Sequence, residues 1–377
     1  QQTGQTVRKV RQMKRRSQEK GKRRKYHVKG KLAASALLLI ISAVLMILAA
    51  QHPDFAEWYS ENIYPLIVTS IGRLWGILPF SASELGLYIL IAAFLLSLGV
   101  MVKNVIKSKR EAWGSWLSGV LLAVGILAFL YTACCGINYH RRPFSEEEGI
   151  ITYQYSVQEL TDICLWLTEE VNALSGEVDR DSSGVMVLET SEGEGAVEAM
   201  QSLAEEFPTL DGYYPQPKEL LVSEILSYQG LTGVYSPFTA EANYNGDMTA
   251  YNIPFTTCHE LSHLRGFMQE EEANFIAFLA CIESERADFR YSGYLSGWVY
   301  CMNALYRADY ESWQEVRQLL AGEAEPDLAA NSAFWDAHEG RISEMSGRIN
   351  DTYLKVNGQA DGVQSYNRMV DLIVAYF

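Results

Sequence analysis

Three apolar runs without charged side chains constrain the fold of this chain more than any other feature. Residues 32–50 form the first run, and residues 86–102 and 116–139 form the second and third. A helix needs about 20 mainly apolar residues to cross the hydrocarbon core of a bilayer. Residues 63–80 are also apolar but are interrupted by prolines and glycines, so we expect an interfacial or re-entrant segment there. The sequence therefore predicts three membrane-spanning helices within residues 32–139.

The basic region before the first run also fits two other interpretations. A signal peptide begins with such a region, but the first apolar run is longer than a typical signal core and two further runs follow it. A basic arm can also bind nucleic acid, but no folded nucleic-acid-binding module accompanies it. We therefore expect a retained membrane helix and no nucleic-acid partner.

Charge is distributed unevenly along the chain. Residues 1–31 contain thirteen Lys and Arg and a single acidic residue, Glu19, whereas residues 141–377 contain thirteen basic and forty acidic residues. Such a division indicates segments that lie in different environments. We expect residues 1–31 to form a basic cytoplasmic arm that lies against the anionic lipid of the bilayer.

The loops between the apolar runs predict an orientation, because Lys and Arg are enriched in cytoplasmic loops. The loop 51–83 contains only Arg73 as a basic residue. The next loop contains four, namely Lys103, Lys107, Lys109 and Arg110. The N-terminus and this second loop are therefore expected in the cytoplasm. Residues 140–377 are expected to form an extracytoplasmic domain of a multi-pass protein of the cell membrane.

Residues 140–377 combine several helical patterns with short strand patterns, which predicts a mostly helical α+β domain. Helices are expected over residues 157–174, 197–207, 220–228, 256–264, 270–281, 313–320, 333–356 and 369–377. Strands are expected at residues 185–188 and 247–254. The last helix is too short to cross a bilayer, so we expect it to dock on the domain or on the membrane surface.

The motif His259-Glu260-x-x-His263 is the strongest functional signal in this domain. Residues four positions apart lie on one face of a helix, so both imidazoles can bind one Zn²⁺. Glu260 can then accept a proton from a water molecule bound to the metal. Thr256 or Thr257 is expected to cap the start of this helix.

The strand expected at residues 247–254 comes directly before the motif. An extended peptide can add to the free edge of a strand, so that hydrogen bonds hold its main chain beside the metal. We expect this strand to be such an edge, although an ordinary buried loop fits the same residues.

A second helix is predicted directly after the motif, and its first turn contains three carboxylates, Glu270, Glu271 and Glu272. Acidic residues are favourable in a first turn because of the helix dipole. Three acidic residues in a row are more than the helix dipole requires. A His₂Glu zinc site takes one carboxylate from a separate element and leaves a position for water, so one of these residues is a candidate third ligand.

The remaining cysteines and histidines give weaker signals. No CxxC pair occurs among the six cysteines, so no separate structural zinc module is expected. Cys258 lies beside His259, but its position directs it away from the histidine face, so burial in the core is expected. His140 is expected to anchor the chain at the membrane interface, and His338 to lie on a helix face.

The motif and the helix after it resemble the gluzincin branch of zinc metallopeptidases. In that branch a Glu-x-x-Ala/Ser-Asp/Asn stretch follows on the next helix, and here the corresponding residues are Glu270-x-x-Ala273-Asn274. The wider chain also resembles an uncharacterised bacterial membrane family, a "domain of unknown function" with three N-terminal spans and an outer HExxH domain. The segments that carry this second resemblance are residues 138–143, 237–243, 259–267 and 353–359.

The gluzincin resemblance implies a role for each matching residue. It implies three zinc ligands, namely His259, His263 and Glu270. Glu260 would be the general base, and Asn274 would hydrogen-bond a ligand imidazole. The gap of six residues before Glu270 is short for many gluzincins, and position 274 is Asn where Asp is common. Glu272 therefore stays open as an alternative third ligand.

We expect a membrane-anchored, zinc-dependent metallopeptidase whose zincin-like extracytoplasmic domain cleaves a peptide or protein substrate. Glu260 would accept a proton from a zinc-bound water and pass it to the leaving amine. Tyr291 or Tyr294 could stabilise the oxyanion, but packing in the core is the preferred interpretation. The main alternative is a non-catalytic membrane receptor or scaffold that binds a peptide or a partner.

Overall fold

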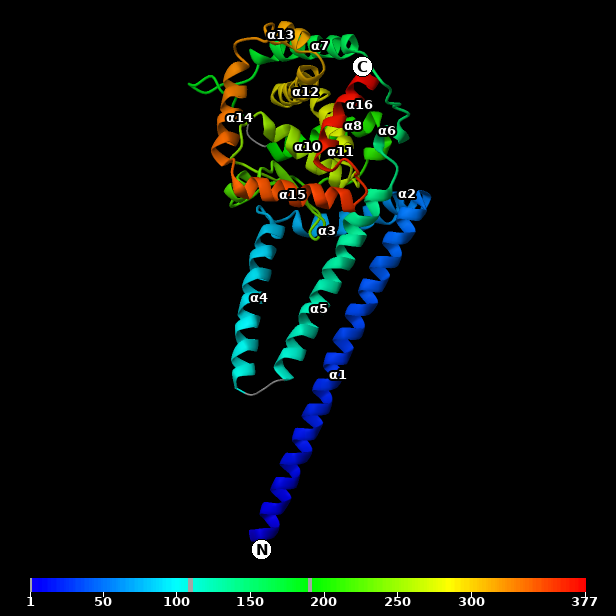
Figure 1. Cartoon of the computed structure of the whole chain (residues 1–377), viewed down its shortest axis with the longest axis vertical. Coiled ribbons are helices and arrows are strands. Elements are labelled where there is room, and N and C mark those ends of the chain that lie inside the picture. Colours follow the sequence, from blue (N-terminus) through cyan, green and yellow to red (C-terminus); the bar gives the residue numbers. More distant parts are fainter. Residues whose placement is uncertain (1, 108–110, 189–191) are drawn as a thin grey trace. The chain divides into compact units, whose positions relative to one another are not determined.

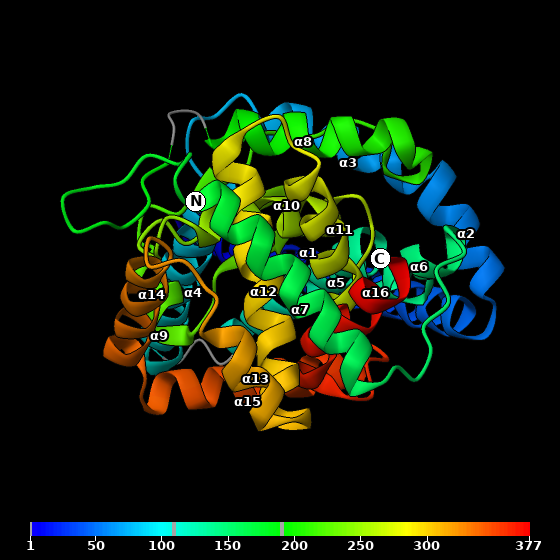
Figure 2. The ribbon, with the colours of Figure 1, turned by 90° about the horizontal axis from the view of Figure 1, so that it is seen from above.

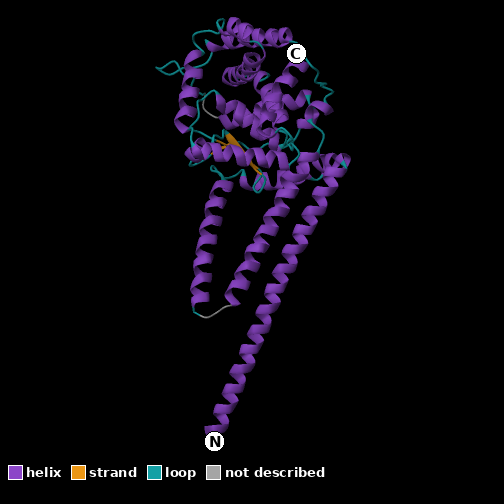
Figure 3. Cartoon of the chain, viewed as in Figure 1, coloured by secondary structure: helices purple, strands orange, loops and turns teal. Residues whose placement is uncertain are grey.

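The chain is mostly helical and carries one small sheet (Figure 3). The computed structural model describes residues 2–107, 111–188 and 192–377. These residues divide into two compact units. The first unit contains the residues up to Leu48 and Leu85–Ala133, and the second contains Ala49–Glu84 and Cys134–Phe377. Each unit is described separately below.

Long apolar helices form the first unit (Figure 1). They are α1 (Gln2–Gln51), most of α4 (Ala82–Ile106) and α5 (Glu111–Tyr131), and α5 continues into the second unit as η1 (Thr132–Gly136) and η2 (Ile137–His140). The three stretches long and apolar enough to cross a membrane are His27–Gln51, Ala82–Ile106 and Ala112–His140. They confirm the three predicted apolar helices. Lys109 and Arg110, on which the predicted orientation partly rests, lie outside the described residues.

Helices α1 and α5 approach each other closely because small residues lie between them. The Ser35 hydroxyl donates a hydrogen bond of 2.7 Å to the Leu121 carbonyl. A Cβ on Gly125 would lie 3.2 Å from the Ser35 Cα. Small residues and hydroxyl hydrogen bonds of this kind hold apolar helices together where no water drives their association.

The second unit gathers its helices around two central ones, α10 (Asn252–Leu264) and α11 (Glu270–Ile282), as Figure 2 shows from above. These two pack against each other and against α12 (Ala287–Ala308), which also packs on α7 (Val157–Ser175). Nearly every residue of α10 and α11 is buried. The remaining helices are α2 (Pro53–Asn62), α3 (Tyr64–Trp75), α6 (Phe144–Glu147), α8 (Glu192–Glu206), η3 (Pro208–Leu210), α9 (Glu224–Gln229), α13 (Tyr310–Arg317), α14 (Glu325–His338), α15 (Arg341–Val356), η4 (Gly362–Arg368) and α16 (Met369–Tyr376).

Most helices of this domain begin and end near their predicted limits, but the prediction of one helix over residues 333–356 is wrong. Helix α14 ends at His338 and α15 begins at Arg341, with an extended Gly340 before α15. The presence of a glycine does not by itself explain the break, because Gly347 stays helical inside α15. The apolar spacing alone did not reveal this break.

The sheet has three short strands in the order β1-β3-β2. Its members are β1 (Lys218–Glu219), β2 (Gly233–Ser236) and β3 (Glu241–Tyr244). Strand β3 lies in the middle, antiparallel to β2 and parallel to β1. Strand β2 is therefore an edge strand.

Two strand predictions were wrong. Residues 247–251 form turns, and α10 already begins at Asn252. Pro254 lies in the first turn of α10, where the missing N–H of proline costs no hydrogen bond. Thr256 and Thr257 consequently lie inside the helix and do not cap it. Residues 185–188 form only an isolated bridge between Met186 and Arg180.

A buried ion pair joins the sheet to the start of α4. Glu241 accepts hydrogen bonds from Lys218 Nζ at 2.6 Å and from the N–H groups of Ala82 and Ser83 at 3.0 and 2.8 Å. Both charged side chains are buried. The carboxylate thus satisfies two N–H groups at the first turn of α4 and one ammonium group at the same time.

We predict that Glu241→Ala destabilises the protein by about 3–5 kcal/mol, because it leaves Lys218 buried without a counterion. The measurement is thermal unfolding of the full chain in detergent, followed by tryptophan fluorescence. Replacing Lys218 by Met in the same chain should recover part of the loss. An unfolding temperature unchanged by Glu241→Ala would contradict the structural role of this pair.

Candidate metal centre

The three predicted ligands converge in the second unit. Helix α10 presents His259 and His263 on one face, with their ring centroids 4.6 Å apart. Glu270, the first residue of α11, places Oε2 at 3.3 Å from His259 Nε2 and 3.4 Å from His263 Nε2. One ligand atom from each residue lies within 4.8 Å of the other two. All three side chains are buried.

The donor set fits a zinc ion. Two imidazole nitrogens and one carboxylate oxygen form a His₂Glu set that leaves one position of a tetrahedral site open. Glu270 Oε2 faces both Nε2 atoms but forms no hydrogen bond of good geometry with any described residue. A buried carboxylate oxygen without a donor is costly unless a cation satisfies it. The orphaned oxygen therefore supports a cation site at this point.

A hydrogen bond behind the site orients one of the imidazoles. His263 Nδ1 lies 2.8 Å from the carbonyl oxygen of Phe267. A carbonyl only accepts, so Nδ1 carries the hydrogen and donates it, and Nε2 is free to bind a metal. Gly266 makes the return of the chain possible, because its φ of 96° is strained for any other residue.

His259 lacks such a partner. Its Nδ1 forms no hydrogen bond among the described residues, although Asn274 acts to raise the pKa of this histidine. The Asn274 amide also donates to the Tyr300 hydroxyl and the Tyr366 carbonyl, each at 3.4 Å. Asn274 therefore lies beside the His259 imidazole, where the gluzincin resemblance expects it, and acts on that ring through its side chain.

The electrostatics of the three ligands are mutually dependent. Burial acts to raise the pKa of Glu270, but the two imidazoles outweigh it and lower the pKa to about 2. Burial acts to lower the pKa of His263, but Glu270 and Glu260 raise it to about 9. Burial lowers the pKa of His259. The site thus holds an ionised carboxylate between two imidazoles, an environment in which a cation is favourable.

Glu260 lies beside the three predicted ligands, and the charges of His263 and Glu270 act on it. It is buried, and its Oε2 has no hydrogen-bond partner among the described residues. Burial raises the pKa of Glu260 to about 8, against the opposing effects of His263 and the Tyr235 N–H. A carboxylate with this proton affinity is suited to accept a proton near neutral pH.

Strand β2 lies directly against Glu260. A Cβ built on Gly233 would lie 2.5 Å from Glu260 Oε1. Only glycine therefore leaves room for the carboxylate at this position. The edge strand that was expected at residues 247–254 is thus supplied by residues 233–236, on the other side of β3 from β1.

Glu272 lies elsewhere. Its two carboxylate oxygens accept hydrogen bonds from the N–H and the hydroxyl of Ser145, at 2.9 and 2.7 Å. It thereby satisfies an N–H in the first turn of α6. Of the two residues that the sequence left open, the structure brings Glu270 to the histidines and not Glu272.

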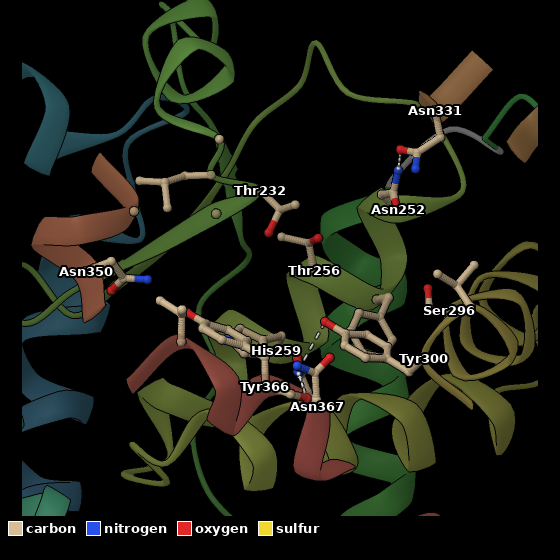
Figure 4. A pocket seen from close by; sticks show the side chains of 18 of the residues that line it. Thr232, Asn252, Thr256, His259, Ser296, Tyr300, Asn331, Asn350, Tyr366 and Asn367 are labelled. Carbon is tan, nitrogen blue, oxygen red and sulfur yellow. Dashed lines mark hydrogen bonds between the residues drawn. The ribbon is translucent and has the colours of Figure 1, made fainter. Parts of the chain in front are cut away.

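A cleft of about 620 Å³ opens over His259 and Glu260 (Figure 4). His259, Tyr300 and Tyr366 lie together at one end of the view, and Asn252 and Asn331 lie at the other. Among the described residues that line it, His259 and Glu260 are the only ionisable groups other than tyrosines. The rest of the polar lining consists of amide and hydroxyl side chains, including six asparagines, Asn252, Asn274, Asn303, Asn331, Asn350 and Asn367.

The sequence did not single out the tyrosines of this cleft. Tyr366 lies with its ring stacked 6.4 Å from that of His259. Tyr291, considered earlier for the oxyanion, donates instead to Asp327 at 2.6 Å, and Tyr294 packs on Trp166. Nothing in the local pattern distinguishes Tyr366, because it comes from η4, about a hundred residues beyond the motif.

A buried arginine supports the turn behind the site. Arg141 donates to Glu57 at 2.8 Å and to Glu147 at 3.1 Å, and its guanidinium lies 4.0 Å from the centroid of the Phe267 ring. It also donates to the Arg265 carbonyl at 3.4 Å. Burial raises the pKa of Glu147 to about 8. Residues 138–143 and 265–267, which carried the resemblance to a membrane family, thus meet at one place.

The cysteines do not contribute to the site. All six are buried and none forms a disulfide. Cys258 points into the core, where its thiol interacts with that of Cys281. His338 packs on Phe334 and Tyr228 at the end of α14. These positions agree with the burial expected for Cys258 and with the helix-face position expected for His338.

Comparison with known proteins identifies a family without a known activity. The family described as "Protein of unknown function (DUF3810)" matches residues 59–374. Because the match covers most of the chain, the chain belongs to this family. No curated protein and no solved structure matches it.

Because Glu270 and Glu272 lie in different places, their variants form a matched pair. We predict that Glu270→Gln weakens zinc binding by more than about 100-fold, since loss of an outer hydrogen-bond partner alone costs 10–100-fold. Glu272→Gln should leave zinc binding unchanged, because its side chain bonds Ser145. A competition titration of purified protein with a zinc chelator measures both. If Glu272→Gln weakened zinc binding and Glu270→Gln did not, Glu272 would be the ligand.

Proposed function

We propose that this member of the family is a membrane-anchored, zinc-dependent metallopeptidase with a zincin-like catalytic domain. The observation that carries the proposal is the convergence of His259, His263 and Glu270 beside a buried Glu260 whose Oε2 has no hydrogen-bond partner among the described residues. A binding module would need neither the carboxylate at position 260 nor the orphaned oxygen of Glu270. This geometry supports a site that holds a cation and moves a proton.

Each residue has a distinct part in the proposed reaction. Zinc, when bound by the three ligands, polarises the scissile carbonyl and increases the acidity of a water molecule. Glu260 accepts a proton from the attacking water and returns it to the leaving nitrogen. Its unpaired Oε2 is free for this transfer.

Tyr366 is the residue best placed to stabilise the oxyanion. It lines the cleft, and the charges of Glu270 and Glu260 both act on its hydroxyl. A phenol that donates to the developing oxyanion stabilises the transition state more than the ground state. Tyr300 also lines the cleft, and its hydroxyl accepts a hydrogen bond from Asn274.

The lining of the cleft favours a peptide as the ligand. Asparagine, serine and threonine side chains offer both donors and acceptors, which match the amide groups of an extended main chain. The edge strand β2 adjoins Glu260 through Gly233, so a peptide added to this edge would run past the proposed base. Apart from His259 and Glu260, which belong to the proposed catalytic centre, the described lining offers no Asp, Glu, Lys, Arg or His that would bind a charged substrate side chain.

We place the domain outside the cytoplasm as part of the same proposal. The three apolar helices support a membrane protein. The concentration of basic residues before the first helix supports a cytoplasmic N-terminus. An odd number of spans then puts residues 140–377 on the opposite side.

We predict that Glu260→Gln abolishes peptide hydrolysis and retains zinc, because the amide cannot accept the proton and the three ligands are untouched. The activity of the purified full chain on a mixed peptide library, measured by mass spectrometry, tests this together with elemental analysis. Equal hydrolysis by the variant would contradict the mechanism. Wild-type protein that neither contains nor takes up zinc would instead support a non-catalytic receptor or scaffold.

A pair of glycines in the cleft tests the contact between β2 and Glu260. We predict that Gly233→Ala retains zinc but lowers the turnover number, because the new methyl group displaces the Glu260 carboxylate. Gly347→Ala is the control, since Gly347 also lines the cleft but a Cβ there meets no atom within 4 Å. Equal turnover numbers for the two variants would show that the position of Glu260 is not set by β2.

A further inference from the structure

We propose that α15 (Arg341–Val356) lies in the interface of the bilayer and binds lipid through one of its faces. Nothing in the HExxH site requires such a face. The proposal rests on the exposure of apolar side chains on α15, on the basic residues beside them, and on the contacts of this helix with the end of the third apolar helix.

The apolar face of α15 is extensively exposed. Ile342, Met345, Ile349 and Val356 are 55, 60, 61 and 79% exposed. Their spacing places them on one side of the helix. A contiguous apolar surface of this kind marks an interaction site in a soluble domain or a membrane-binding surface. Met345, Ile349 and Val356 also line a shallow apolar groove together with Tyr353.

Basic residues run along the helix next to this apolar face. Arg341, Arg348 and Lys355 are exposed and follow one another at intervals of seven residues, each directly before Ile342, Ile349 or Val356. Lys355 is paired with Asp351 at 2.7 Å. Neither Arg341 nor Arg348 forms an ion pair with another described residue. An apolar face bordered by Arg and Lys is the pattern of a helix that lies at the surface of an anionic membrane.

Contacts within the second unit place α15 beside a membrane exit. The Tyr353 hydroxyl lies 3.3 Å from that of Tyr139, and the two rings meet edge to face at 6.0 Å. The same hydroxyl lies 3.6 Å from Cys135 Sγ. Both partners belong to the last turns of the apolar helix Ala112–His140. Helix α15 therefore contacts the end of a segment that is long and apolar enough to cross a membrane.

A second helix of this unit carries a similar exposed face. Leu66 and Leu74 of α3 and Ile77 just beyond it are 66, 61 and 80% exposed. This segment connects the first and second apolar helices, so its ends are also tied to the membrane. The occupant that fits both α3 and α15 is the lipid itself.

A different face of α15 lines the cleft over the metal site. Ser343, Ser346 and Asn350 belong to this face. One helix thus borders lipid on one side and the cleft on another. If the proposed peptidase function holds, the cleft accepts polypeptide segments close to the membrane surface, such as those beside a transmembrane helix or a lipid anchor.

Spin labels can test the lipid contact without any enzymatic activity. The full chain is reconstituted in nanodiscs of phosphatidylethanolamine and phosphatidylglycerol, with a nitroxide on Ile349→Cys and, separately, on Val356→Cys. The native cysteines are all buried, so the introduced thiol is labelled selectively. Leu319→Cys is the matched control, because Leu319 is apolar and 56% exposed but follows α13, which packs on α7 and α12.

We expect the labels on α15 to be more accessible to oxygen, which partitions into lipid, than to a water-soluble nickel complex. The control label should be more accessible to the nickel complex than to oxygen. Labels on α15 that behave like the control would show that this face is in water. Labels shielded from both reagents, or broadened by a second nitroxide, would show that protein covers the face. Either of these results overturns the proposal.

A second arm tests the inferred substrate class. Ile349→Glu should lower the rate of cleavage of a peptide that carries a palmitoyl chain and leave the rate for the same peptide without the chain unchanged. Equal effects on both peptides would refute membrane-proximal substrates while leaving the spin-label result in place. Absence of cleavage by the wild type would instead refute the peptidase function.

Discussion

The hydrogen bond between His263 Nδ1 and the Phe267 carbonyl is the contact on which the proposed site depends. It fixes which nitrogen faces Glu270, and it exists only because Gly266 turns the chain back behind α10. Arg141 holds that turn through the Phe267 ring and pairs with the buried Glu57 and the partly buried Glu147. The candidate metal centre and the segment that follows the third apolar helix therefore share one largely buried network, and disturbing either should disturb both.

Periodicity in the sequence predicted the parts of this arrangement that are local. The spacing of His259 and His263 was enough to place both imidazoles on one face of a helix, and three uncharged runs were enough to predict three long apolar helices. The choice between Glu270 and Glu272 was beyond the sequence, because two residues in the same helical turn point in different directions and only packing decides which meets α10. Ser145, whose hydrogen bond to Glu272 keeps that side chain away from the histidines, lies more than a hundred residues earlier in the chain.

The errors have a common physical origin, since they concern elements whose conformation is set by distant neighbours. Residues 247–254 looked like an edge strand, but Pro254 suits the first turn of α10 and the edge is formed by β2. The neighbouring sequence does not mark Gly233 or Tyr366 as site residues. Gly233 matters because Glu260 occupies the space that a side chain would fill. Tyr366 matters because a segment near the C-terminus brings its ring against His259. The division at Gly340 separates α14 from α15 and so creates the helix that borders the cleft and exposes an apolar face.

The ligand set of the site is the central claim, and zinc K-edge X-ray absorption of the zinc-loaded full chain tests it most directly. Two imidazole nitrogens and carboxylate or water oxygens at about 2.0–2.2 Å are predicted, with no sulfur in the first coordination sphere. The imidazole contribution should fall to that of one ring in His263→Ala. A zinc–sulfur distance of about 2.3 Å would assign the metal to a cysteine such as Cys258, and it would contradict the site built on His259, His263 and Glu270.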